Sequence, residues 1–307
     1  MQPASLVPMA ALTGQQFHLV AGDFAATVVE VGAGLRQFTH RGLDVTVGYG
    51  EDELPPRGAG AVLVPWPNRL RGGRYSYGDR DFQLALTEPA RGNAIHGLAR
   101  WTRWTPLAVD TSSVTLAVDL VPQTGWVFEV RVEVTYRLHP ETGLGVQIVA
   151  RNNGRWPAPF GAGFHPYLSL HGHRLDDVSV WLPAGQRLVS GEDQLPVGLA
   201  AVDGTGYDLR HGQRLEARRF DDGFTGLPDT PQARYAEVRT ESGGARLWFD
   251  EAFGFLQLFT IEDLTPGLPA VAIEPMTCPA DAFNSGTGLI VLEPGADWSA
   301  GWGISPI

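Results

Sequence analysis

Hydrophobic and polar residues alternate along much of the chain, most regularly between residues 130 and 150. Every even position from Val130 to Leu138 is apolar, and every odd position between them is polar or charged. After a turn at residues 139–143, the same period resumes at Leu144, Val146, Ile148 and Ala150. A period of two is typical of a strand with one buried face. We therefore predict an antiparallel hairpin over residues 130–150.

Further segments carry the same signal. A second hairpin is predicted over residues 235–250, where Ser242–Gly244 supplies the turn. Shorter strands are predicted at Phe17–Val20, Ala26–Val31, Arg74–Tyr77, Phe82–Leu86 and Val114–Leu120. The segments Phe255–Ile261 and Ala270–Ile273 are apolar on both faces, as expected of strands in the middle of stacked sheets.

No window of useful length has a clean helical period, and we find no linker or internal repeat. Gly191–Gly206 is the most loop-like stretch, but it does not divide the chain. The 38 glycines and 23 prolines in 307 residues suit many short strands joined by turns. We predict an all-β fold, a large antiparallel β-sandwich that forms a single domain over residues 1–307.

Charge and cysteine content narrow the classes of function. A formal net charge of −11 argues against a nucleic-acid or anionic-membrane partner. The single cysteine, Cys278, excludes an internal disulfide and a zinc site built from several cysteines. Residues 1–19 lack the basic region and apolar run of a signal peptide, and no apolar stretch approaches a membrane span. We expect a soluble, cytoplasmic protein.

Two short segments in the first third of the chain hold candidate binding groups. Prolines and glycines bracket Asn68 and Arg69 within Pro65–Tyr75, so a fixed guanidinium could grip sugar hydroxyls with paired donors. His96, followed by Gly97, could approach a ligand closely and titrate near neutral pH. Each residue could equally be an ordinary surface side chain.

Two later segments hold candidate acid–base groups. His165 lies among aromatic residues and glycines in Phe160–Leu168, where burial would tune its pKa. The alternative is a core histidine bonded to a backbone carbonyl. Glu274 closes an apolar strand and is followed by Pro275. Desolvation there would raise its pKa toward the range of a general base. The alternative is a glutamate at the strand end that faces water and has no catalytic role.

Together these four segments resemble the aldose 1-epimerase (galactose mutarotase) family, in particular its bacterial branch. The residues that carry the resemblance are Pro-Trp-Pro-Asn-Arg, His-Gly, His-Pro-Tyr and Glu-Pro-Met-Thr, in the family's order and spacing. The likeness covers the chain from about Gly34 to its C-terminus. It implies a β-supersandwich in which a sugar lies across an open cleft.

The resemblance also implies roles for individual residues. Glu274 matches the general base that removes the proton from the anomeric hydroxyl, and His165 matches the acid that protonates the ring oxygen. His96 and Arg69 match groups that hold and polarise the sugar. Asp221 matches a carboxylate that binds sugar hydroxyls, although Asp222 beside it could be confused with it. We also assign Asn68 to sugar binding, and Tyr167 and Trp66 are candidates for an aromatic face against the sugar.

The chemistry itself requires such groups. Ring opening removes a proton at O1 and supplies one at the ring oxygen, and a carboxylate with an imidazole can do both near neutral pH. No metal or other cofactor is required. We expect a small-molecule sugar as the only partner, and a monomer or a homodimer.

Four alternatives stay open at this point. Arg71 and Arg74 could meet the phosphate of a hexose 6-phosphate. The chain could be a sugar-binding protein without catalysis, although it keeps Glu274, His165 and His96. His171 and His173 could chelate a metal. A glycosidase would normally use two carboxylates, whereas the pairing here is glutamate with histidine. Proline after His165 and Pro-Met-Thr after Glu274 depart from the galactose-specific members, so the sugar itself is left open.

Overall fold

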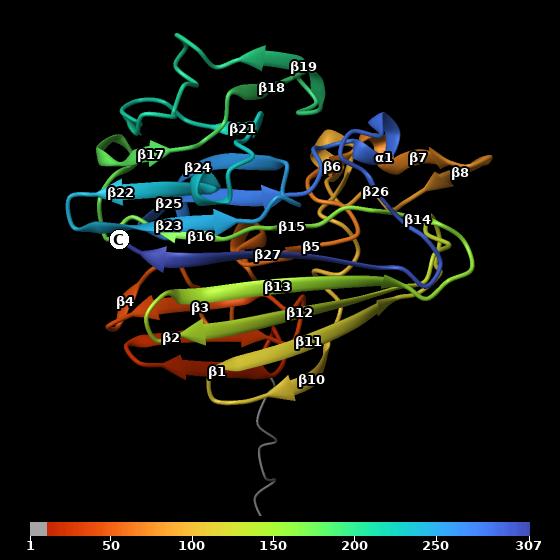
Figure 1. The fold of residues 1–307 in the computed structure, drawn as a ribbon, viewed down its shortest axis with the longest axis horizontal. Coiled ribbons are helices and arrows are strands. Elements are labelled where there is room, and N and C mark those ends of the chain that lie inside the picture. The colour runs from red at the N-terminus through yellow and green to blue at the C-terminus, as the bar shows by residue number, and fades with distance from the viewer. Residues whose placement is uncertain (1–10) are drawn as a thin grey trace, which may run out of the picture.

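The computed structural model describes residues 11–307. The first part of the segment 1–19, on which the expectation of no signal peptide depends, lies outside the described residues. Two large antiparallel sheets dominate the fold, and strands account for most of the regular structure (Figure 1). The prediction of an all-β sandwich is confirmed.

The larger sheet has nine strands. Its order is β10 (Thr105–Val109), β11 (Ser113–Leu120), β12 (Val130–His139), β13 (Gly143–Asn152), β27 (Asp297–Pro306), β23 (Gly243–Phe249), β22 (Tyr235–Thr240), β17 (Ser179–Trp181) and β20 (Gln213–Arg214). The predicted hairpins are β12–β13 and β22–β23. The alternation explains the first of them, because the even positions of β12 are buried and the odd ones are not.

The second sheet has eight strands and carries the site described below. Its order is β19 (Pro196–Ala201), β18 (Gln186–Ser190), β21 (Asp221–Thr225), β24 (Phe255–Thr265), β25 (Leu268–Met276), β15 (Gly163–Phe164) and β5 (Val62–Leu63), while β16 (Tyr167–Ser169) also pairs with β25. β24 and β25 are central, as their apolar sequences predict. Strand β19 lies inside the stretch 191–206, so the prediction of a loop there is wrong in part.

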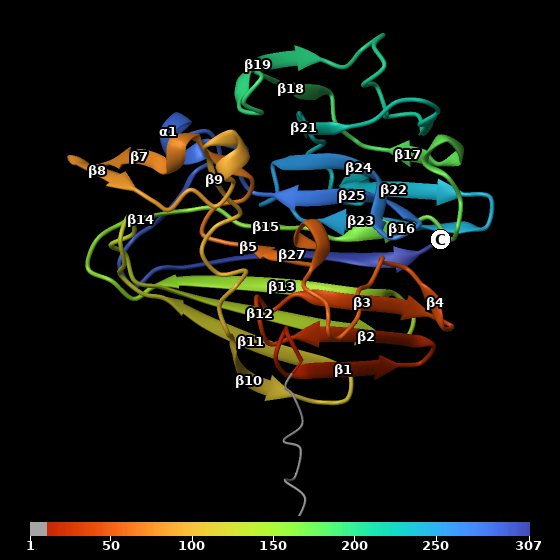
Figure 2. The ribbon, with the colours of Figure 1, turned by 180° about the vertical axis from the view of Figure 1, so that it is seen from behind.

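A four-stranded sheet packs against strands β11 and β12 of the large sheet, as seen from behind in Figure 2. It consists of β1 (Gln16–Ala21), β2 (Phe24–Val29), β3 (Leu35–His40) and β4 (Leu43–Asp44). Three two-stranded sheets complete the β-structure: β6 (Arg69–Leu70) with β9 (Ala94–Ile95), β7 (Arg74–Tyr77) with β8 (Arg80–Gln83), and β14 (Ala158–Phe160) with β26 (Ile290–Leu292).

Helical structure is short. The described residues contain one α-helix, α1 (Ala282–Ser285), and the 3-10 turns η1 (Pro56–Gly58), η2 (Arg71–Gly73), η3 (Pro89–Arg91), η4 (Leu175–Asp177) and η5 (Pro231–Ala233). None of these helices is long and apolar enough to cross a membrane. The predicted strand Phe82–Leu86 is wrong at its end, since β8 stops at Gln83.

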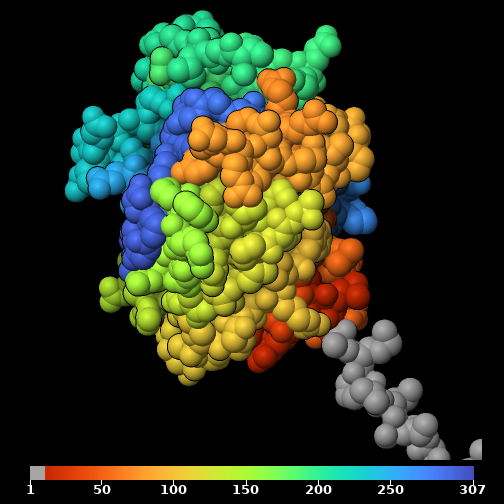
Figure 3. Space-filling view, turned by 90° about the vertical axis from the view of Figure 1, so that its right-hand side faces the viewer, coloured from red at the N-terminus to blue at the C-terminus, as the bar shows by residue number. Residues whose placement is uncertain are grey.

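Strand β7 and helix α1 contact each other and form one lobe of the molecule. In Figure 3 the part of the chain around β7 is orange and the part around α1 is blue. The centre of this lobe is aromatic: the ring of Phe283 lies 5.6 Å from that of Trp66 and 5.1 Å from that of Tyr75. Trp66 is 3% exposed and belongs to this core. The prediction that Trp66 offers an aromatic face to the sugar is wrong, because the indole packs against Phe283 and does not line the cavity described below.

Candidate active site

A cavity of about 260 Å³ lies over the face of the eight-stranded sheet at β21, β24, β25 and β16. Loops from the first third of the chain form the opposite wall. Apart from Trp66, the residues that the sequence analysis assigned to catalysis or sugar binding line this cavity: Glu274, His165, His96, Arg69, Asp221, Asn68 and Tyr167. The structure therefore brings together seven side chains from five segments that are distant in the sequence.

Strand register explains the sheet side of the cavity. Glu274 on β25 pairs with Gln257 on β24, and Phe259, two residues further along β24, pairs with Asp221 on β21. Residues two apart on a strand share a face, so these side chains point to the same side of the sheet. Tyr167 joins the same row because it pairs with Ala272, the partner of Phe259.

Glu274 and His165 form a buried carboxylate–imidazole pair. Nε2 of His165 lies 3.4 Å from Oε1 of Glu274, and the two side chains are 6% and 3% exposed. Burial raises the pKa of Glu274 well above its ordinary value, and the negative charge of Asp221 raises it further. Burial also lowers the pKa of His165 to about 3. Both shifts favour the uncharged forms, so the pair holds one proton between its two pKa values.

The pair keeps two polar atoms for a ligand. Within residues 11–307, Oε2 of Glu274 and Nδ1 of His165 have no hydrogen-bond partner although both are buried. Unpaired buried polar atoms are costly, and a ligand in the cavity would relieve that cost for these two. The ring of Tyr167 stacks on that of His165, with centroids 4.8 Å apart, and fixes the orientation of the imidazole.

His96 is held as a neutral hydrogen-bond donor. Its Nδ1 accepts a hydrogen bond of 3.2 Å from the backbone N–H of Asn68, which puts the ring proton on Nε2. Its pKa is lowered well below the ordinary value, first by burial and then by the nearby charges of His165, Arg100 and Arg69. The ring lies edge-on to that of His165, with centroids 5.5 Å apart.

Arg69 is held by a residue that the sequence analysis missed. Its Nε donates to Oε2 of Glu88 over 2.8 Å and its Nη2 donates to Oε1 over 3.0 Å. Such a bidentate pair fixes the plane of the guanidinium. Asn68 adds a contact through its Oδ1, which accepts the backbone N–H of Arg69 at 2.9 Å.

The structure separates Asp221 from its neighbour. Asp221 lines the cavity, and its Oδ1 accepts a hydrogen bond of 2.8 Å from Nε2 of Gln257. Asp222 does not line the cavity and lies 3.6 Å from the guanidinium of Arg187. Gln257 is a second site residue that sequence reasoning missed. Its strand was predicted, but one glutamine among apolar residues gave no sign of a role.

Backbone conformations outside the usual regions cluster in the cavity wall. Arg57, Asn68 and His96 have φ values of 51°, 54° and 61°. Residues other than glycine pay on the order of 1–3 kcal/mol for sparsely populated conformations, which are concentrated at functional sites. Gly97 supports the turn at His96, because a Cβ there would lie 1.9 Å from the carbonyl oxygen of Val64.

Other candidates from the sequence lie elsewhere. Arg71 lies 2.7 Å from Asp193 and 3.4 Å from Asp281, and Arg74 bonds to Gln83; neither arginine lines the cavity. Within residues 11–307, no group of three or more histidine, cysteine, aspartate or glutamate side chains is arranged to hold a metal, so His171 and His173 form no such cluster. Cys278 is fully buried, and burial raises the pKa of its thiol to about 12.

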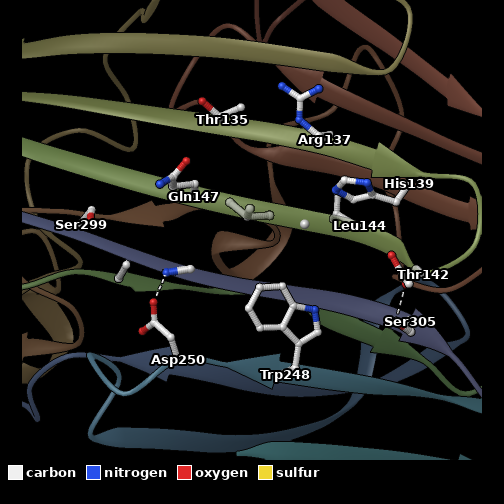
Figure 4. Close-up of a pocket in the computed structure, with 14 residues that line it drawn as sticks. Thr135, Arg137, His139, Thr142, Leu144, Gln147, Trp248, Asp250, Ser299 and Ser305 are labelled. Carbon is white, nitrogen blue, oxygen red and sulfur yellow. Dashed lines mark hydrogen bonds between the residues drawn. The ribbon is translucent and has the colours of Figure 1, made fainter. Parts of the chain in front are cut away.

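A larger hollow of about 730 Å³ lies on the outer face of the nine-stranded sheet (Figure 4). It holds one imidazole, His139 on β12, and one carboxylate, Asp250 just after β23. Strands β13 and β27 separate these two strands, so at about 4.8 Å per strand the two side chains start on the order of 14 Å apart. The hollow therefore lacks a paired acid and base, which the smaller cavity has.

Known proteins resemble this chain over most of its length. The family model described as Aldose 1-epimerase matches residues 15–305. The chain is 35% identical over 283 residues to the uncharacterized protein YihR of Escherichia coli, covering 92% of this chain and 90% of that protein. It is 27% identical over 249 residues to YphB of the same organism, covering 76% and 78%.

Solved structures share the fold. A putative aldose 1-epimerase from Escherichia coli K12 superposes with a TM-score of 0.82 at 20% identity, over 95% of this chain and 99% of that one. A GalM/aldose epimerase homologue from C. elegans superposes with a TM-score of 0.84 at 17% identity, over 95% and 98%. At these identities the likeness is one of fold.

Proposed function

The chain belongs to the aldose 1-epimerase family and is a carbohydrate epimerase, an isomerase, and we propose that it interconverts the α and β anomers of an aldohexose with a free C1 hydroxyl. The observation that supports this most is the contact of 3.4 Å between His165 and Glu274 inside a cavity sized for a small molecule. Each residue of the pair keeps one buried polar atom without a partner. An anomeric carbon with its two oxygens would satisfy them.

The reaction needs one proton to move at each oxygen of the anomeric carbon. Glu274 as carboxylate takes the proton of the O1 hydroxyl while His165 as imidazolium protonates the ring oxygen, and the bond between C1 and the ring oxygen breaks. The aldehyde turns about the C1–C2 bond and presents its other face. On closure His165 takes the proton of the former ring oxygen and Glu274 returns one to O1, so no proton is gained or lost.

The single proton held by the pair suits this sequence of steps. Moving it from Glu274 to His165 turns the uncharged pair into the base and the acid that ring opening requires, without exchange with solvent. The uncharged pair can also act with the roles reversed, as ring closure demands. A bound sugar whose hydroxyls hydrogen-bond to both residues would lower the cost of the charged form.

The other residues of the cavity bind the sugar in this proposal. Neutral His96 offers Nε2–H as a donor to an oxygen at the reacting end, and it keeps this donor at any pH above its lowered pKa. The Arg69 guanidinium, oriented by Glu88, donates to hydroxyl groups, while Asp221 accepts from them. Tyr167 supplies an aromatic surface beside His165.

Polarimetry tests the proposal directly. Freshly dissolved α-D-glucose and α-D-galactose would be followed with and without the purified protein after chelator treatment. Faster approach to the same final rotation is expected, with loss of the acceleration in Glu274→Gln. Glu133→Gln is the matched control, since Glu133 pairs with Arg131 on the outer face of the large sheet. Sugar binding without acceleration for either sugar or any acidic hexose would instead favour a non-catalytic binding protein.

A further inference from the structure

Two arginines that the sequence analysis did not single out also line the cavity. Arg57 belongs to η1, and Arg100 follows the loop of His96. Within residues 11–307, neither guanidinium has a carboxylate within ion-pair distance or a hydrogen bond from its side chain. The guanidinium carbon of Arg100 lies 5.4 Å from the centroid of the ring of Trp101.

This isolation contrasts with the other arginine in the cavity. Two nitrogens of Arg69 donate to Glu88, whereas Arg100 is only partly exposed and has no such partner. Burial lowers the pKa of Arg100, and Glu88 opposes this only from a distance. Charged side chains that leave water are normally paired. A negatively charged group of the ligand would therefore supply the partner that Arg100 lacks.

The charges around the cavity lead to the same conclusion. Three guanidinium groups, from Arg57, Arg69 and Arg100, face two carboxylates, from Glu88 and Asp221. Glu274 and His165 share one proton in the proposed mechanism, so the pair adds no net charge to this count. A chain with a net charge of −11 thus has a cavity with an excess of positive charge. Such a local excess attracts anions over a distance, whereas a neutral sugar gains only hydrogen bonds from the same groups.

Both arginines act on the same pair of stacked rings. The charge of Arg100 lowers the pKa of His165, and the charge of Arg57 opposes the burial that raises the pKa of Tyr167. The Tyr167 hydroxyl also donates to the backbone carbonyl of Arg57 over 3.3 Å. His165 and Tyr167 stack on each other, and both arginines line the same cavity as these rings.

We propose that the sugar carries an acidic oxyanion group away from C1, and that Arg57 and Arg100 bind this group and set the preference for it. The inference rests on the proposed function, since it names the class of hexose that the same cavity takes. Guanidinium forks match the geometry of phosphate and carboxylate oxygens. The anion would pair the two arginines while its ring hydroxyls meet Asp221 and Arg69.

Exchange between anomers, followed by NMR, tests this with glucose, glucose 6-phosphate and glucuronate as probes. The wild-type protein is expected to show a kcat/KM at least tenfold higher for one of the two acidic sugars than for glucose, and added salt should reduce this preference. Arg57→Gln and Arg100→Gln should bring the ratio of kcat/KM for the acidic sugar to kcat/KM for glucose toward one. Arg100→Lys should restore part of this ratio. Arg151→Gln is the control, since Arg151 pairs with Asp297 on the outer face and should leave the ratio unchanged.

Calorimetric titration with the same three sugars separates the two proposals. Equal kcat/KM for glucose and both acidic sugars, unaffected by the arginine variants, would overturn the inference while leaving the epimerase intact. Tighter binding of an acidic sugar, lost in Arg100→Gln but without exchange of any anomer, would support the anion site and count against catalysis. Binding of inorganic phosphate as tight as that of glucose 6-phosphate would show that the site does not recognise the sugar, and would also overturn the inference.

Discussion

Nε2 of His165 and Oε1 of Glu274 lie 3.4 Å apart at a place where almost no water reaches either side chain. Neither group could be charged alone at such a site without a large desolvation cost. Together they can exchange one proton, and this makes the pair, more than either residue, the unit on which the proposed reaction depends.

Replacing Glu274 by glutamine should remove the reaction and keep the fold. The amide has nearly the same shape but cannot accept the O1 proton, so we expect kcat to fall by about 10²–10⁴-fold, the range of general acid–base catalysis. Polarimetry measures the loss and circular dichroism checks the fold. Near-normal turnover would take the role of base away from Glu274.

The pH profile should reflect the raised pKa of Glu274. The proposed pair works with one proton, which it loses from Glu274 as the pH rises. Because burial lifts the pKa of Glu274 well above 4.5, kcat/KM for a neutral sugar should fall on the alkaline side, at a pH clearly higher than 4.5. Asp221→Asn should shift that limb toward lower pH, since it removes the negative charge that raises the pKa further. A limb that stays in place in this variant would contradict the electrostatic link.

Stability should depend on His165 in a defined pH window. Its pKa is about 3 in the folded protein and about 6.5 when exposed. Between these values the unfolded chain binds more protons at this residue, so stability rises with pH and the contribution is lost as pH falls toward 3. The free energy of unfolding of the wild type, measured against that of His165→Asn, should therefore increase from about pH 3 to about pH 6.5. A difference that does not vary with pH would mean that the imidazole is not desolvated.

Asp221 and Asp222 offer a matched pair of substitutions. Asp221→Asn should raise KM by about tenfold or more, because a charged acceptor for hydroxyl groups is lost, a change of roughly 1.4 kcal/mol. Asp222→Asn should leave KM within a small factor, since Asp222 lies beside Arg187 and outside the cavity. Steady-state kinetics on the preferred sugar decide the matter, and equal effects would show that the two roles are not separated.

Glu88 should act through Arg69. Glu88→Gln breaks the bidentate pair and frees the guanidinium, which is only 10% exposed. Removing one member of a buried pair costs up to about 3–5 kcal/mol, and less where water reaches the pair, as it does here. We expect a higher KM, a smaller change in kcat and a lower melting temperature. Unchanged KM would show that Arg69 does not need its fixed plane.

The fold could be predicted largely because its strands have regular patterns. The segment 130–150 has a strict period of two, and β12 and β13 follow it. The charge-bearing segments could be found for a different reason, since His165 and Glu274 stand in apolar surroundings where such residues are rare. Their roles stay predictions.

The residues that were missed have no such local signal. Glu88 matters only because folding brings it to Arg69, 19 positions away in the sequence, and Gln257 only because it pairs with Glu274 across two strands. Arg57 and Arg100 look like surface arginines in the sequence. Their interest comes from three-dimensional properties, the cavity that both line and the lack of an ion-pair partner for the partly buried Arg100, which no single segment can reveal.

Glu274 is anchored on β25 at the centre of a sheet, whereas Arg57, Asn68, His96 and Arg100 stand on turns and loops of the opposite wall. Central strands tolerate little change and loops tolerate much. Related proteins with this fold could therefore bind other sugars through changes at residues such as Arg57 and Arg100 while they keep Glu274 as the base. Substitutions at these two positions, natural or designed, could therefore change the substrate specificity and leave the sheet behind Glu274 unaltered.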